Sequence, residues 1–93
     1  MRLSVQYMAQ LRWLVGRNEE QVVLPAGSSL DQLLDHVAKH QQEAAVHLLS
    51  SSGQMRPSLL VALNGRAVAA QDAATTTLAE GDIVTLLPPI AGG

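Results

Sequence analysis

The sequence contains no cysteine, and this absence excludes several kinds of chemistry at once. Without thiols the chain can form no disulfide, no thiolate metal site and no thiol nucleophile. This composition fits a reducing compartment. The first residues also alternate between polar and apolar types and contain no apolar core of a signal peptide. We therefore expect a cytoplasmic protein.

Aromatic residues and lysine are also rare, and the net charge is small. Tyr7 and Trp13 are the only residues of the Phe, Trp and Tyr class, and Lys39 is the only lysine. Any core must therefore consist of aliphatic side chains. The net charge is −2 and no basic stripe is present, so we expect no nucleic-acid partner. No apolar run approaches the roughly 18 residues that a membrane span requires, so we expect no membrane partner.

The residues that are present predict one globular domain. The chain has 93 residues, of which 47% are hydrophobic and 15% are charged. Residues 2–8 alternate, with Leu3, Val5 and Tyr7 on one face, and this pattern predicts a half-buried strand. A short helical turn over 9–15 and a second strand over 19–24 follow. The short connection between the two strands predicts an antiparallel pair.

A helix is expected over residues 29–40. Ser28 and Ser29 are candidate N-caps, and Gln32 can complete a capping box. The apolar residues then recur at helical spacing, namely Leu30, Leu33, Leu34, Val37 and Ala38. The pattern resumes at residues 44–49, either as a continuation of this helix or as a second, short one. The helix is long enough to serve as the crossover between two parallel strands.

The second half of the chain predicts three further strands. The unbroken apolar run 59–63 indicates a buried strand. Asn64-Gly65 predicts a type I′ hairpin turn into a short strand over 66–68. Residues 69–77 are expected to be irregular, and the last strand covers 83–87. The fold class is thus α+β, a mixed sheet of four to five strands with one main helix across one face.

The sequence closes with Pro88-Pro89-Ile90-Ala91-Gly92-Gly93. Proline fixes φ and favours an extended path, and glycine has no Cβ atom that would block a narrow channel. We therefore expect a domain over residues 1–87 and an extended tail over 88–93. Such a tail could carry the terminal carboxylate of Gly93 into the active site of another protein.

These features resemble a known family. The order of elements is similar to the β-grasp, or ubiquitin-like, fold. The end from Asp82 to Gly93 resembles the small subunit of molybdopterin synthase and the sulfur carriers of the thiamine pathway. The opening Tyr7-Met8-Ala9-Gln10-Leu11-Arg12-Trp13-Leu14-Val15-Gly16 is similar to the same subunit's aromatic-apolar-Ala-Gln-x-Arg-x-x-x-Gly pattern. The residues before the prolines depart from that subunit, which commonly has aromatics where this chain has Leu86 and Leu87.

The resemblance implies a chemistry for the tail. An E1-like adenylating enzyme would use ATP to convert the Gly93 carboxylate to an acyl adenylate. A sulfide or persulfide sulfur would then displace AMP and leave a thiocarboxylate. The chain itself would bind no cofactor and no metal, and would not be an enzyme. Because it has no cysteine, the terminal carboxyl is its only plausible covalent handle for sulfur.

The resemblance also implies partners and contact residues. The sulfur would pass to the large subunit of molybdopterin synthase or to another sulfur-accepting enzyme. Tail contacts would come from Gly92, Ala91, Ile90, Pro89 and Pro88. Partner contacts would come from Leu87, Leu86, Met8 and Arg12. Because side chains alternate along a strand, either Leu86 or Leu87 should point into the core instead.

Three alternatives stay open on the sequence alone. The chain could carry sulfur for thiamine, cysteine or another metabolite. It could be a ubiquitin-like modifier joined through Gly93 to lysines of other proteins, although a single lysine argues against chains of its own copies. It could also be an interaction module with an inert tail.

Two weaker signals lie outside the tail. His36 and His40 are four residues apart, and His47 would join them on a continued helix. We interpret this face as solvated rather than as a metal site, because no carboxylate or thiolate completes a ligand set. Trp13 either anchors a partner or covers one end of the core.

Overall fold

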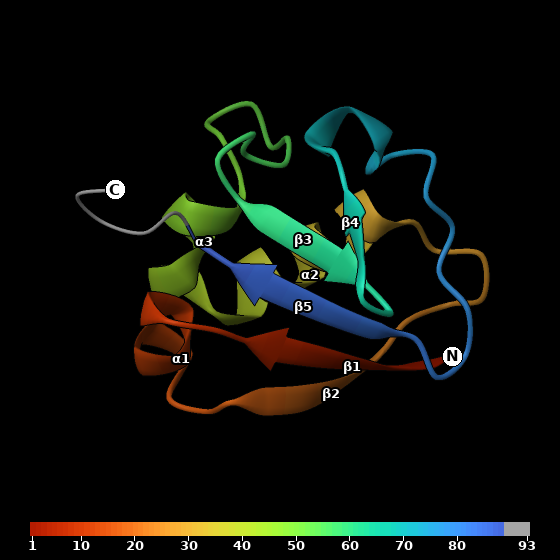
Figure 1. Cartoon of the computed structure of the whole chain (residues 1–93), viewed down its shortest axis with the longest axis horizontal. Helices are drawn as coiled ribbons and strands as arrows, with labels where there is room; N and C mark the ends of the chain where they lie inside the picture. The colour runs from red at the N-terminus through yellow and green to blue at the C-terminus, as the bar shows by residue number, and fades with distance from the viewer. Residues whose placement is uncertain (89–93) are drawn as a thin grey trace.

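The computed structural model describes residues 1–88 (Figure 1). The elements follow the order that the sequence predicts. They are β1 (Arg2–Tyr7), α1 (Gln10–Val15), β2 (Glu19–Val23), α2 (Leu30–His40), α3 (Gln42–Leu48), β3 (Leu60–Leu63), β4 (Arg66–Val68), a 3-10 turn η1 (Ala70–Asp72) and β5 (Ile83–Leu87). The domain has the predicted α+β, ubiquitin-like architecture.

The five strands form one mixed sheet in the order β2-β1-β5-β3-β4. The β1–β2 pair is antiparallel, as predicted, with Leu3 opposite Val22. The one parallel pair joins β1 to β5, with Tyr7 beside Leu86. The connection through α2 and α3 joins β2 to β3, and these two strands run in the same direction, as predicted for a crossover. They are not neighbours, because β1 and β5 lie between them. The first and last strands thus lie side by side at the centre of the sheet (Figure 1).

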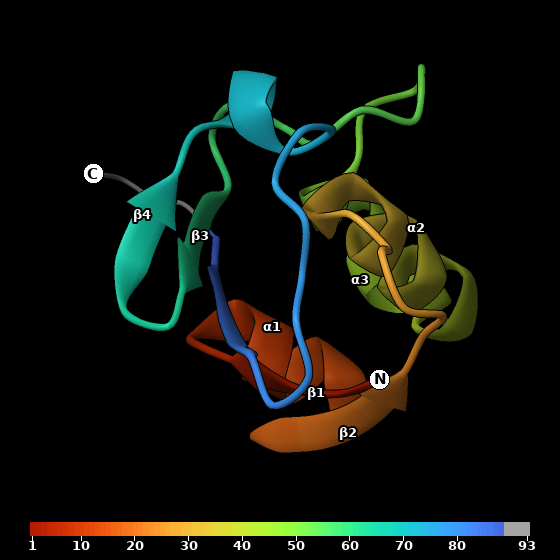
Figure 2. The same cartoon turned by 90° about the vertical axis from the view of Figure 1, so that its right-hand side faces the viewer.

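The α2–α3 pair covers one face of the sheet and leaves the other face open (Figure 2). Side chains of β1 alternate, and Leu3, Val5 and Tyr7 are fully buried beneath the helices. The apolar residues predicted for α2 are all buried as well. Burial of this aliphatic face contributes the main favourable free energy of folding. The core therefore lies between the sheet and the α2–α3 layer.

Local signals explain where α2 begins and where α3 separates from it. The backbone N–H of Ser29 donates a hydrogen bond of 2.9 Å to the Gln32 side chain, as the capping box requires. Gln41 then leaves helical geometry at φ −121° and ψ 70°. The chain restarts as α3 at Gln42, so the open question about residues 44–49 is answered by a second helix. Leu48 and Ala44 dock this helix in the core.

The hairpin between β3 and β4 is the turn that Asn64-Gly65 predicts. Asn64 has φ 51° and Gly65 has φ 82°, and a type I′ turn requires positive φ at both positions. The Asn64 side chain also bonds to Asp82 and accepts the N–H of Ile83. The turn is thereby fixed to the start of β5.

The strand over 59–63 differs from its prediction. Leu59 and Val61 are buried, but the Leu60 side chain is 59% exposed. The helices cover only one face of β3, so alternate residues of the apolar run point to the open face. An unbroken apolar run therefore indicates here a half-buried strand with an apolar outer surface.

Candidate functional site

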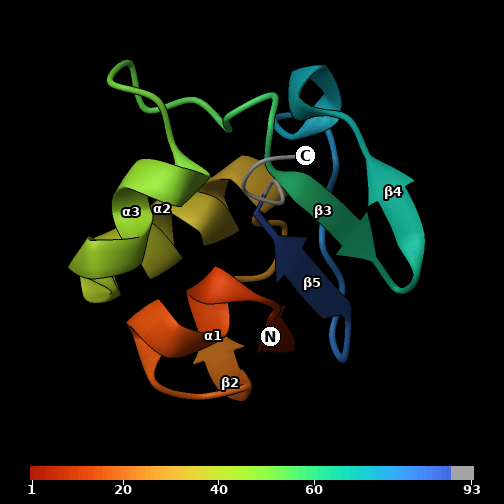
Figure 3. The ribbon, with the colours of Figure 1, turned by 60° about the vertical axis from the view of Figure 1, so that its left-hand side comes forward.

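The candidate site is the end of the sheet where β5 passes into the tail. The backbone N–H of Met8 donates a hydrogen bond of 3.0 Å to the carbonyl oxygen of Leu86. This bond continues the parallel β1–β5 ladder to the last residues of the domain. The end of β5 therefore lies beside the residues that join β1 to α1. Figure 3 shows α1 next to this end of β5.

The predicted alternation at the end of β5 is confirmed. Leu86 is fully buried, while Leu87 is partly exposed on the open face. The prediction of Leu86 as a partner contact is therefore wrong, because its side chain is part of the core. Pro88 is also buried. The domain boundary between residues 87 and 88 stays a prediction.

The open face beside this exit carries an apolar surface. Leu60 lies directly opposite Leu87 in the antiparallel β3–β5 pair. Met8 follows the parallel register on the other side of Leu87, and its side chain is 37% exposed. We call the three residues Met8, Leu60 and Leu87 the exit surface. The family resemblance indicates Met8 and Leu87 as contact residues but not Leu60. Leu60 lies in an unbroken apolar run, so the sequence does not reveal that alternate residues of this strand are exposed.

A shallow groove extends the exit surface across β3 and β4. Its lining includes Leu60, Ala62, Ala67, Thr85 and Leu87. Among the described residues that line it, none is charged. A contiguous exposed apolar surface is a feature of contact sites for other proteins. The exit surface and its groove are therefore suited to an apolar partner surface.

Arg12, the remaining predicted contact, is exposed on α1 at the same end of the molecule. The predictions for Pro89, Ile90, Ala91, Gly92 and Gly93 lie outside the described residues. The structure thus brings together Met8, Leu87 and the start of α1. It removes Leu86 from the predicted partner contacts.

A partly buried hydrogen bond supports the strand that leads to Met8. The Tyr7 hydroxyl donates to the Glu20 carboxylate, and Arg17 lies 3.8 Å from the same carboxylate. Burial, followed by the bond and negative charge of Glu20, raises the pKa of Tyr7 well above its usual range. At alkaline pH the phenol therefore stays neutral in the folded chain, whereas it ionises in the unfolded chain.

Replacing Tyr7 with Phe is expected to lower the free energy of unfolding at pH 7 by about 1–3 kcal/mol, because Glu20 loses a donor. A raised pKa in the folded state stabilises the protein below the unfolded pKa of about 10 and loses that effect above it. The wild-type advantage should thus shrink by about 1.4 kcal/mol per pH unit above 10. Urea titrations of both proteins between neutral and alkaline pH test this. A constant difference would show that the folded phenol titrates normally.

The two histidines of α2 form a stacked pair. The rings of His36 and His40 stack with centroids 4.2 Å apart, and His40 Nδ1 donates to the His36 carbonyl at 2.8 Å. Burial, together with the nearby His40, lowers the pKa of His36. Within residues 1–88 no three His, Cys, Asp or Glu side chains come together as a ligand set.

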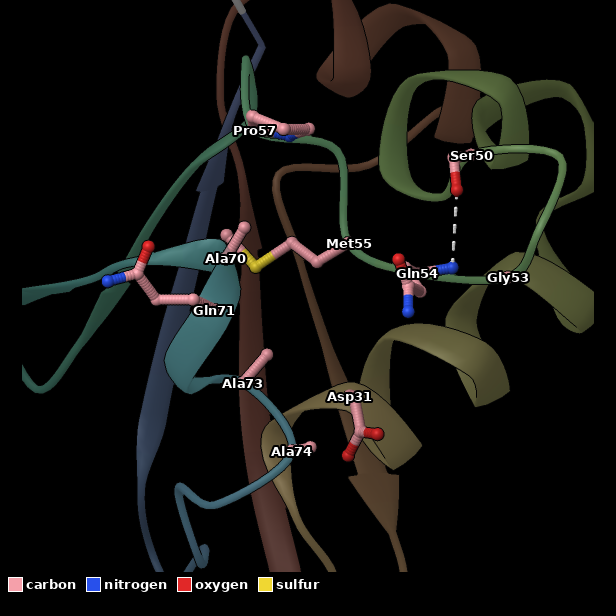
Figure 4. Close-up of a pocket in the computed structure, with 10 residues that line it drawn as sticks. All are labelled: Asp31, Ser50, Gly53, Gln54, Met55, Pro57, Ala70, Gln71, Ala73 and Ala74. Atoms are coloured by element: carbon pink, nitrogen blue, oxygen red, sulfur yellow. Dashed lines mark hydrogen bonds between the residues drawn. The ribbon is translucent and has the colours of Figure 1, made fainter.

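A second hollow lies between the start of α2, the loop after α3 and the η1 turn (Figure 4). Asp31 is the one charged residue of its lining. The Ser50 hydroxyl there accepts the backbone N–H of Gln54 at 3.4 Å. A single carboxylate among amides, hydroxyls and alanines offers no acid–base pair. We therefore place the candidate site at the exit surface.

The family comparison covers this site and the tail together. The ThiS family matches residues 5–93, which include every residue of the exit surface and the closing glycines. The chain belongs to the ThiS family. It is thus a member of a family of ubiquitin-like sulfur carriers and modifiers. Within the part of the chain that the structure describes, no helix is long and apolar enough to cross a membrane.

Individual proteins resemble this ThiS-family chain over all or nearly all of its length. Small archaeal modifier protein 3 of Haloferax volcanii is 29% identical over 93 residues, which are all of both chains. The crystal structure of SAMP1 from Haloferax volcanii superposes with a TM-score of 0.88 at 22% identity over all of both chains. A putative molybdopterin converting factor subunit 1 from Pyrococcus furiosus has a TM-score of 0.77 at 26% identity, covering 97% of this chain and 99% of the other.

Proposed function

We propose that this chain is a sulfur carrier whose Gly93 carboxyl group is adenylated and then converted to a thiocarboxylate. The carboxylate oxygen would attack the α-phosphorus of ATP and release pyrophosphate. Sulfide would then attack the acyl carbon, and AMP would leave. The adenylating enzyme would supply the catalytic groups, and the reaction would take place in the cytoplasm. Activation of this kind divides one difficult substitution into two easier steps.

One observation carries this proposal. The strand that leads to the tail is anchored at the centre of the sheet, and apolar side chains surround its exit on the open face. The Leu86 carbonyl is held by Met8, while Leu60 and Leu87 present the apolar surface. A partner that binds this surface would receive the tail in a defined direction. The ThiS-family match through Gly93 supports the same role for the closing glycines.

We further propose that the sulfur goes to the large subunit of molybdopterin synthase. The resemblance of residues 7–16 to the small subunit of that enzyme favours this pathway. The likeness to a putative molybdopterin converting factor subunit from Pyrococcus furiosus supports it. The chain would then act as the sulfur-donating subunit beside a catalytic one.

The test is a change in intact mass. The purified chain is incubated with ATP, sulfide and the E1-like adenylating enzyme of the same organism. The expected product is heavier by the difference between one sulfur and one oxygen atom. Omission of ATP is the control and should leave the mass unchanged. If the mass is also unchanged in the complete reaction, the carrier proposal fails.

A second function, protein modification, is favoured by the full-length likeness to small archaeal modifier protein 3. The same adenylate could be attacked by a lysine amine of a target protein instead of by sulfur. Affinity-tagged chain expressed in its own organism would then be recovered in isopeptide linkage through Gly93. Peptide mass spectrometry distinguishes such adducts from the thiocarboxylate. Recovery of unconjugated chain alone would contradict this second function.

A further inference from the structure

Trp13 is the most exposed large apolar side chain among the described residues. Its side chain is 86% exposed although α1 is well anchored. Leu11 of the same helix is fully buried, so α1 cannot rotate to bury the indole. The alternative that Trp13 covers one end of the core is therefore wrong. An exposed indole is costly to keep in water, and tryptophan is enriched in protein interfaces.

The chain after α1 folds back beside this indole. Gly16 ends the helix in the left-handed region at φ 84°, and its N–H donates to the Arg12 carbonyl at 2.9 Å. The carbonyl of Asn18 then accepts the N–H of Tyr7 at 2.8 Å. The result is a small hollow lined by Arg12, Trp13, Gly16, Arg17 and Asn18. We call this hollow the Trp13 pocket.

The Trp13 pocket is positively charged. Arg12 forms no ion pair within residues 1–88, and Arg17 has only a 3.8 Å contact with Glu20. Glu20 already accepts the Tyr7 hydroxyl, so its carboxylate is shared. Glu19, the next acidic residue, lies opposite Gln6 in the sheet. Two exposed guanidinium groups beside an indole therefore characterise this pocket in a chain whose net charge is −2.

The pocket also lies at the end of the molecule where the tail leaves. Met8, which bonds to Leu86, precedes Trp13 by five residues, and five residues span at most about 18 Å. An enzyme that takes the tail would therefore pass close to the indole. Guanidinium groups bind carboxylates through paired hydrogen bonds, and opposite charges accelerate association.

We propose that the Trp13 pocket binds an acidic segment of the adenylating enzyme, with carboxylates on Arg12 and Arg17 and an apolar side chain on the indole. This inference rests on the proposed function, because it requires that enzyme as a partner. A carrier must associate and leave in every cycle. Contacts that raise the association rate through charge suit this requirement.

The single tryptophan provides a direct probe. The chain is labelled with 5-fluorotryptophan, which yields one fluorine resonance, and is titrated with the purified adenylating enzyme in the absence of ATP. We expect the Trp13 resonance to shift or broaden on binding. Substitution Trp13→Ala, and the double substitution Arg12→Glu with Arg17→Glu, should each weaken binding at least about tenfold by calorimetry. The double variant should also lose most of the salt dependence of the affinity.

Arg66→Glu is the matched control. Arg66 is exposed at the hairpin beside the start of β5, at the opposite end of the sheet from Met8, so this change alters charge without touching the pocket. Its affinity should stay within about twofold of wild type. An unperturbed fluorine resonance, wild-type affinity of the pocket variants, or an equal loss in Arg66→Glu would overturn the inference. The mass assay is run in parallel on the wild-type chain. If that chain gains sulfur, the proposed function stands even when the inference about the Trp13 pocket fails.

Discussion

Deletion of Gly92 and Gly93 is expected to abolish sulfur acceptance completely while leaving the fold intact. The deletion removes the proposed reactive carboxyl and moves the new terminal carboxylate two residues closer to the domain. Within residues 1–88 the hydrophobic core runs from Leu3 to Leu86, and glycine has no side chain to bury. The free energy of unfolding should therefore change by less than about 0.5 kcal/mol.

Two measurements on the shortened chain test this separation. Intact-mass analysis after incubation with ATP, sulfide and the adenylating enzyme should detect no sulfur. Thermal unfolding should match that of the full chain. The control is Gly93→Ala, which keeps the full length of the chain and a carboxylate at its end. It separates the loss of the terminal residues from a change in the residue that carries the carboxylate. Sulfur gain by the shortened chain would show that the reactive group lies elsewhere.

Substitution by aspartate is expected to have different effects at two neighbouring leucines of β5, on folding at one and on binding at the other. Leu86→Asp should unfold the domain, because Leu86 is fully buried and an unpaired buried carboxylate costs several kcal/mol. Leu87→Asp should fold, because this side chain reaches the open face. It should instead weaken binding to the sulfur-accepting protein by about 2–4 kcal/mol, as expected when a desolvated interface contact is lost. Circular dichroism reports folding, and titration calorimetry reports affinity.

The open face supplies matched controls for this pair. Leu60→Asp, opposite Leu87, should reproduce the binding defect of Leu87→Asp. Ile83 lies on the same face of the same strand but at its far end, and its side chain is 41% exposed. Ile83→Asp should therefore bind normally. Normal binding by folded Leu87→Asp would exclude the exit surface from the interface, and a folded Leu86→Asp would contradict the assigned register.

Local patterns in the sequence were sufficient for most of the fold. Alternation located β1, helical spacing located α2, and Asn64-Gly65 located a turn whose positive φ values only such residues adopt readily. The parallel β1–β5 pair was missed because strand neighbours far apart in the chain leave no local signal. The exposure of Leu60 was missed for a related reason, since an apolar run does not reveal which face the helices cover.

The site was predictable only in part. The closing glycines and the contacts at Met8 and Leu87 came from a family resemblance, while alternation alone could not decide between Leu86 and Leu87. Pro88 is assigned to the tail because proline favours extended chain, and the sequence pattern does not reveal that this residue is buried. The charge and exposure around Trp13 depend on the turn at Gly16, which brings Arg17 back beside the helix. Sequence spacing does not encode that proximity.

The central position of β5 has a mechanical consequence. Hydrogen bonds to β1 on one side and β3 on the other run across the strand direction. A pull on the tail therefore acts along β5 and loads both ladders in shear, so that many bonds share the force. An edge strand would instead be peeled away one bond at a time. An enzyme that grips the tail and closes around it could draw the carrier inward without pulling the domain apart.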